Sequence, residues 1–133
     1  MSIESEIFSR LSGYAGLTSI LGGLDPHGHV KIYALKIEQD TVLPAVTYFK
    51  VSDIPEHAMG SDADIKSTRI QVSCWADTYK IVKALEVQVK AALSRYRSGN
   101  IQDCFLDGSL DLYDSEVNIF HVPIDFLVFY YGG

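Results

Sequence analysis

The chain has 133 residues, of which 47% are hydrophobic and 21% are charged, a balance typical of a folded domain of common size. This composition excludes a disordered tail, a collagen-like fibre and a cysteine-rich secreted miniprotein. Eleven Lys and Arg residues against seventeen Asp and Glu residues give a net charge of −6. That balance disfavours binding to the outside of nucleic acid, which needs a basic face. We expect a single domain over residues 1–133.

The N-terminal part predicts a short helix, and the middle of the chain predicts a long one. Apolar residues spaced i, i+4 from Ile3 to Leu11 indicate the first helix, and a short apolar turn is expected at residues 17–21. The longer amphipathic helix is predicted at about residues 78–97, with Asp77 as its N-cap. We expect this helix to lie across a sheet.

Three strands are predicted between these two helices. Weak alternation indicates a short strand within residues 30–37, and a second strand at residues 45–51. The clearest alternation is at residues 68–75, where every second residue is apolar. The polar stretch 53–65 between the second and third strands predicts a long loop or an extended hairpin tip.

The C-terminal part predicts a hairpin formed by residues 101–113 and 117–131. The final strand alternates over an unusually long stretch, and Pro123 within it suggests a bulge or an edge position. Its far end is apolar on both faces, so a second layer, a neighbouring subunit or a partner is expected to cover it. The residues expected at that contact are Leu127, Phe129 and Tyr131. The resulting order is α-β-β-β-α-β-β, an α+β domain with a mainly antiparallel sheet.

The charges are divided unevenly along the chain. Residues 1–97 carry as many acids as bases, so residues 98–133, which contain no Lys or Arg, account for the whole net charge. All of these acids belong to the predicted C-terminal hairpin: its first strand and turn carry Asp103, Asp107, Asp111, Asp114 and Glu116, and its second strand carries Asp125. They form either a solvated acidic face, or a surface that repels DNA or docks on a basic partner.

The sequence contains no pattern of residues that predicts catalysis or a cofactor. Phosphate-binding glycine loops and nucleophile elbows are absent from the sequence. His27 and His29 share a turn with Asp25, but a metal site needs two further ligands, and an ordinary turn is the simpler interpretation. His121 is interpreted as a cross-strand partner rather than a base. We therefore expect a non-enzymatic protein without a metal or cofactor.

The cysteines and the chain ends point to an intracellular protein. Cys74 and Cys104 have the spacing of neither a zinc site nor a redox pair, and we expect both to be buried free thiols. The N-terminus has no apolar core of signal-peptide length, and the longest apolar run, residues 126–131, is too short to span a bilayer as a helix. These features predict a soluble, intracellular protein.

Seven stretches, taken in order, resemble the tail-completion (tail-terminator) proteins of long-tailed bacteriophages and prophages. They are KIY (31–33), LPAVTY (43–48) with VS (51–52), HAMGSD (57–62), TRIQVSCWADTY (68–79), VKAAL (89–93), DLY (111–113) and DFLVFY (125–130). Together they cover nearly the whole chain. Cys74 departs from the small polar or acidic residue expected at its position.

The resemblance implies a structural protein of the virion. It implies an α+β fold, no enzymatic activity, and assembly as a homo-hexameric ring that caps the tail tube and offers a surface for the DNA-filled head. The expected partners are further copies of the chain, the tail-tube protein and a head–tail connector protein, and DNA passes through without being specifically bound. No catalytic residues are transferred from the family.

The lumen of such a ring is expected to be acidic, because an acidic lining would limit adhesion of DNA. The two candidate linings are the loop with Asp53, Glu56, Asp62 and Asp64, and the acidic hairpin. Two alternative functions remain open. One is a small dimeric α+β domain that binds a ligand or acts as an enzyme, and the other is a head–tail connector protein of neighbouring position.

Overall fold

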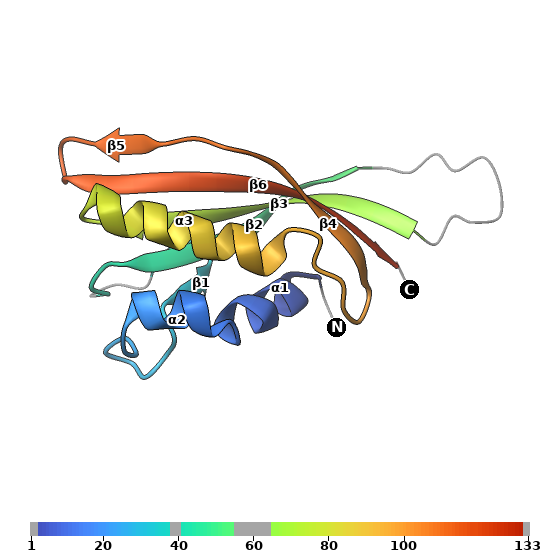
Figure 1. Ribbon diagram of the computed structural model, residues 1–133, viewed down its shortest axis with the longest axis horizontal. Coiled ribbons are helices and arrows are strands. Elements are labelled where there is room, and N and C mark those ends of the chain that lie inside the picture. Colours follow the sequence, from blue (N-terminus) through green and yellow to red (C-terminus); the bar gives the residue numbers. More distant parts are fainter. Residues whose placement is uncertain (1–2, 38–40, 55–64, 132–133) are drawn as a thin grey trace.

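A computed structural model describes residues 3–37, 41–54 and 65–131 of the chain. Within these residues the fold is α+β, with a mixed sheet of six strands and three helices (Figure 1). The elements, in chain order, are α1 (Ile3–Ser12), α2 (Ala15–Leu21), β1 (Ile32–Ala34), β2 (Ala45–Ile54), β3 (Ile65–Ala76), α3 (Tyr79–Leu93), β4 (Ile101–Ser109), β5 (Leu112–Asp114) and β6 (Ile119–Tyr131). No helix in this part of the chain is both long enough and apolar enough to cross a membrane.

The strands follow the order β1-β2-β3-β6-β4, and β5 also pairs with β6. β1 runs parallel to β2, while the other four pairings are antiparallel. β6 therefore lies inside the sheet, between β3 on one side and β4 and β5 on the other. This arrangement places the longest strand at the centre of the domain.

The observed order of elements differs from the predicted one in two places. The apolar turn expected at residues 17–21 is part of the helix α2, and the first strand of the C-terminal hairpin is divided into β4 and β5. Both parts keep the same register on β6, with Ser109 opposite Ile124 and Leu112 opposite His121. The interruption faces Pro123, whose carbonyl accepts a hydrogen bond from Leu110 N (3.3 Å). Because Pro123 has no N–H to donate on that same side, the ladder is broken there.

The sheet and the helices share one core. The inward residues of the two central strands are fully buried: Ile70, Val72 and Cys74 on β3, and Val122, Ile124, Phe126 and Val128 on β6. Val82, Leu85 and Val89 of α3 pack against them, as the predicted apolar stripe requires. The predicted alternation of β3 and β6 is thus confirmed.

Both ends of α3 differ from the prediction. Thr78, not Asp77, is the N-cap, and its Oγ1 accepts a hydrogen bond from Ile81 N (3.2 Å). The helix ends at Leu93 rather than at residue 97. Arg95 takes a positive φ of 60° and donates its N–H to the Cys104 carbonyl (2.6 Å), so contact with β4 ends the helix.

The two cysteines are buried free thiols, as predicted. Burial raises the pKa of the Cys104 thiol to about 12 and also raises the pKa of Cys74. The thiolate is the reactive form of cysteine, so neither side chain is expected to react at neutral pH.

Candidate assembly surface

One face of the sheet carries no helix in the described part of the chain, although some of its small side chains, such as those of Thr47 and Ser73, are buried. The helices pack on the face that carries Ile70 and Phe126, and the main cluster of buried apolar residues lies on that side. Figure 1 shows α3 lying along β3 and β6 on that side. The opposite face, called the outer face here, carries the other set of alternating residues. Its central strand contributes His121, Pro123, Asp125, Leu127, Phe129 and Tyr131.

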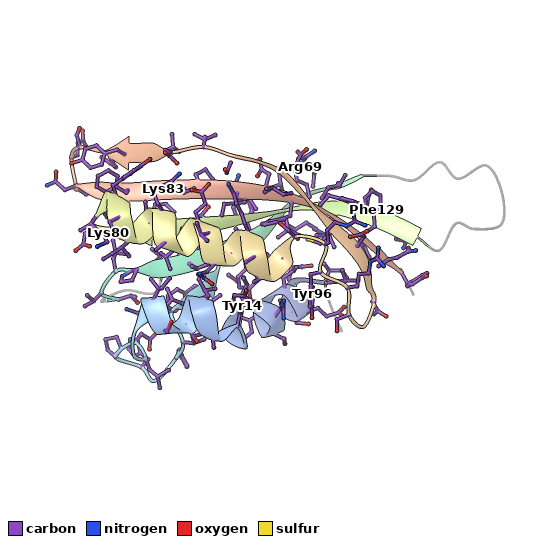
Figure 2. The ribbon with its side chains drawn as sticks, in the orientation of Figure 1. Tyr14, Arg69, Lys80, Lys83, Tyr96 and Phe129 are labelled. Carbon is purple, nitrogen blue, oxygen red and sulfur yellow. The ribbon has the colours of Figure 1, made fainter. Side chains whose placement is uncertain are left out.

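The three predicted contact residues lie together on this outer face, near the C-terminal end of β6 and beside β4. Tyr131 is exposed, and Leu127 and Phe129 are half-buried; Figure 2 labels Phe129. Phe105 on β4 lies opposite Leu127 and meets the Phe129 ring edge-on, with centroids 5.7 Å apart. We call Phe105, Leu127, Phe129 and Tyr131 the aromatic patch. Phe105 was not predicted from the sequence: pairing the predicted strands residue by residue places it opposite Asp125, on the same face, whereas the observed register places it opposite Leu127.

Two arginines border the aromatic patch. The Arg95 guanidinium lies 4.8 Å from the centre of the Phe105 ring, a cation–π distance. Arg95 also donates two hydrogen bonds to the Asp103 carboxylate (3.0 and 2.8 Å), and Arg97 donates a third (3.3 Å). Burial opposes ionisation of Asp103, but these donors together hold its pKa below the usual value. A groove of about 500 Å³ beside them is lined by Arg97, Gln102, Asp103, Phe105 and Phe129.

The acidic hairpin is partly neutralised by cations from the first 97 residues. Asp107 pairs with Arg69, and Asp111 pairs with Lys83 (3.0 Å). Asp103 is held by Arg95, as described above. The acids at the end of the hairpin differ, since no cation pairs with Asp114 or Glu116 within the described ranges.

The end of the hairpin pairs with β6 and carries apolar side chains that are exposed to solvent. Every residue from 110 to 118 is exposed, and this segment is called the hairpin tip here. Its large apolar side chains are Leu110, Leu112, Tyr113 and Val117, each about half exposed. At the foot of the tip, His121 stacks on Trp75 with ring centroids 3.7 Å apart, which confirms its interpretation as a cross-strand partner. Burial lowers the pKa of His121 and so favours the neutral ring.

Of the acidic loop predicted to line the lumen, the structure describes Asp53 alone. Asp53 belongs to β2, next to its end at Ile54. Glu56, Asp62 and Asp64 lie outside the described residues. The loop therefore stays a prediction.

The turn around Asp25 is held by hydrogen bonds to the Asp25 carboxylate. One oxygen of the buried Asp25 carboxylate accepts from the N–H groups of His27 (2.8 Å) and His29 (2.9 Å), and the other accepts from the Tyr33 hydroxyl (2.7 Å). Burial opposes ionisation of Asp25, but these donors lower its pKa below the usual value. No group of three or more metal-ligand side chains occurs among the residues that the structure describes.

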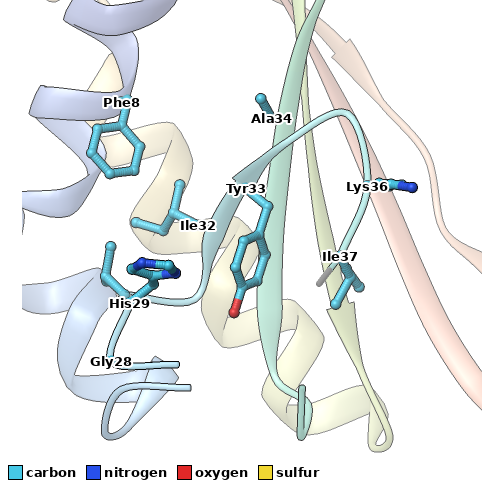
Figure 3. A pocket seen from close by; sticks show the side chains of 9 residues that line it. Phe8, Gly28, His29, Ile32, Tyr33, Ala34, Lys36 and Ile37 are labelled. Carbon is cyan, nitrogen blue, oxygen red and sulfur yellow. The ribbon is translucent and has the colours of Figure 1, made fainter. Parts of the chain in front are cut away.

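A cavity of about 790 Å³ lies beside this turn (Figure 3). It is lined by Phe8, Gly28, His29, Val30, Ile32, Tyr33, Ala34, Lys36 and Ile37. The Tyr33 hydroxyl is already bonded to Asp25, and Lys36 points away from the other labelled side chains (Figure 3). Among the described lining residues, His29 is the remaining side chain with a polar ring, and the rest of the lining is apolar or glycine.

A buried carboxylate on α3 was not anticipated from the sequence. Glu86 is 5% exposed and forms ion pairs with Lys83 (2.5 Å) and Lys90 (2.7 Å). Ser109 of β4 donates a hydrogen bond to it (2.9 Å), so the carboxylate links the helix to the sheet. Burial opposes its ionisation, but the two lysines and Ser109 bring its pKa down to about 2.

We predict that Glu86 makes the fold sensitive to acid. Its pKa is about 2 in the folded chain and ordinarily 4.5, so the unfolded chain binds the extra proton between these values. Stability from Glu86 is then present above pH 4.5 and is lost as the pH falls toward 2. Since both lysines are partly exposed, we expect a loss of about 1–3 kcal/mol.

The measurement is urea unfolding of the wild type and Glu86→Gln from pH 7 to pH 2. The variant is expected to be less stable at pH 7 and to lose less stability below pH 4.5. Equal pH dependence of the two proteins would contradict this role of Glu86.

The comparisons with known proteins identify a family and a similar fold. A family described as tail completion protein gp17 matches residues 5–131. Among solved structures, a chain from the virion of a native gene transfer agent particle has a similar fold, with a TM-score of 0.74 and 13% sequence identity. The alignment covers 98% of this chain and 96% of that one. No curated protein sequence matches the chain significantly. The match to residues 5–131 shows that the chain belongs to the tail completion protein family and is a structural protein of the phage virion.

Proposed function

We propose that the chain is the single-domain subunit of a six-membered ring that caps the phage tail tube and offers the surface to which the head is joined. The observation that carries this proposal is the outer face with its aromatic patch, in a chain of the tail completion family. A ring needs contacts between two different surfaces of neighbouring subunits. An apolar patch of this kind supplies one such surface. The proposed activity is assembly alone, without catalysis.

The proposed partners are neighbouring copies of the chain, the tail-tube protein below the ring and a connector protein above it. DNA would pass through the lumen without specific binding. We propose that an acidic segment lines the lumen, because repulsion of phosphates would limit adhesion. The loop with Asp53, Glu56, Asp62 and Asp64 is the stronger candidate, since three carboxylates of the hairpin, those of Asp103, Asp107 and Asp111, are paired with cations.

Native mass spectrometry tests the ring, and a tail-joining assay tests its role. The wild-type protein is expected to form a six-fold species, alone or on purified tail tubes, and to restore head joining to tails that lack it. A stable dimer that does not bind tail tubes would contradict the proposal.

Neutralising the acidic loop tests the lumen. Changing its four acids to Asn and Gln is expected to preserve the ring and to slow DNA ejection. The control changes Asp77, an exposed acid that lies outside both the loop and the hairpin tip, to Asn. Unchanged ejection in the loop variant would contradict the proposed lining.

A further inference from the structure

We propose that the hairpin tip of each subunit docks on the aromatic patch of the next, with two copies of this chain as the partners. This inference rests on the proposed ring and names the two surfaces that meet in it. Three observations carry it: the chemistry of the tip, the chemistry of the patch, and the distance between them along β6.

The hairpin tip has the composition of a segment that another protein covers. Leu110 and Val117 are 55% and 57% exposed, and Leu112 and Tyr113 are 45% and 51% exposed. The tip is anchored by the pairing of β5 with β6, yet it displays these apolar side chains to solvent. Asp114 and Glu116 add two negative charges, because no cation pairs with them in the described part of the chain.

The aromatic patch complements the tip both in its apolar surface and in its charge. Phe105 is 37% exposed, and the groove beside it holds about 500 Å³, room for an apolar side chain of the tip. Arg95 and Arg97 share the single carboxylate of Asp103, which leaves one positive charge in excess. Both guanidinium groups are largely exposed, at 61% and 65% of the side chain. An acidic apolar tip therefore fits a basic aromatic groove.

The turn of the tip, which carries Glu116 and Val117, cannot reach the aromatic patch of its own subunit. The tip joins β6 at Ile119, whereas Phe129 lies ten residues further along the same strand. At about 3.3 Å per residue the two sites are about 30 Å apart on one continuous strand. The contact must therefore join two copies, and it uses a different surface on each. Such a contact is heterologous and closes into a ring when the rotation between copies allows it.

Engineered cysteines test the contact directly, because both native thiols are buried and unreactive. Val117→Cys places a thiol in the tip, and Gln102→Cys places one in the groove. We expect disulfide-linked oligomers to form under mild oxidation in a mixture of the two single variants and in the double variant. The crosslink is expected both in the purified ring and in assembled particles. Each single variant alone is the control and is expected to stay uncrosslinked. Crosslinking of one single variant with itself indicates a two-fold contact and overturns the proposal.

A charge exchange gives a second, independent test. Arg97→Glu leaves Arg95 on Asp103, and we expect it to raise the protein concentration needed for half assembly by about tenfold or more. Glu116→Arg is expected to do the same, and the double variant is expected to return to within about threefold of the wild type. Rings that form equally well in both single variants overturn the docking contact but leave the proposed function intact. A wild type that forms no ring, even on tail tubes, contradicts the proposed function itself.

Discussion

Replacing Phe126 with alanine is expected to lower the free energy of unfolding by about 3–5 kcal/mol, the largest effect on stability that we predict for a single substitution. Phe126 is 0% exposed and is the largest fully buried side chain of the described residues. It lies in the middle of β6, opposite Ile70 of β3 and Leu106 of β4. Its removal leaves a cavity between the sheet and the helices that rigid neighbouring strands cannot fill.

Urea unfolding followed by circular dichroism measures this loss. The matched control is Phe105→Ser, which changes a ring of the same size on the outer face, and a loss of about 1 kcal/mol is expected there. A loss below about 1 kcal/mol in Phe126→Ala would mean that the core closes around the missing ring, contrary to the prediction.

The same Phe105→Ser substitution is expected to have the largest effect on assembly. Phe105 belongs to the outermost strand, is 37% exposed, and contacts Phe129 and Arg95 rather than the core. A serine there removes the aromatic wall of the groove and exposes a hydroxyl to the docking surface. Central aromatic residues dominate the energy of protein interfaces. We therefore expect a folded protein that forms no six-fold species and does not restore head joining.

Leu24→Ser is the control for this assembly experiment, because Leu24 is 66% exposed and lies in the segment between α2 and β1. It should leave both assembly and head joining unchanged. Normal rings in Phe105→Ser, measured by native mass spectrometry at the same concentration, would mean that the aromatic patch is not an interface.

The elements that depend on local patterns are predicted well. Alternation over residues 68–75 and along the last strand places the buried residues of β3 and β6 correctly. The apolar stripe of the long helix likewise identifies the face that packs on the sheet. The division of the C-terminal hairpin was missed, because it depends on how Pro123 meets the neighbouring strand.

The candidate surface is predicted only in part. The position of Leu127, Phe129 and Tyr131 on one face follows from the period of two in a strand. Phe105 and Arg95 join them through the pairing of β4 with β6 and through the end of α3, which are contacts between distant segments. Their role as an interface remains a prediction.

The charges, too, are determined partly by the sequence and partly by the tertiary structure. By itself the sequence determines that the last 36 residues hold the net charge of −6, that two strands and one helix are amphipathic, and that both thiols suit a core. Only the tertiary structure decides that Arg69, Lys83 and Arg95 neutralise acids of the hairpin, and that α3 stops at Leu93. The physical reason is that periodicity and propensity act over a few residues. Ion pairs and the hydrogen bond from Arg95 to Cys104 join segments whose proximity exists only once the sheet has formed.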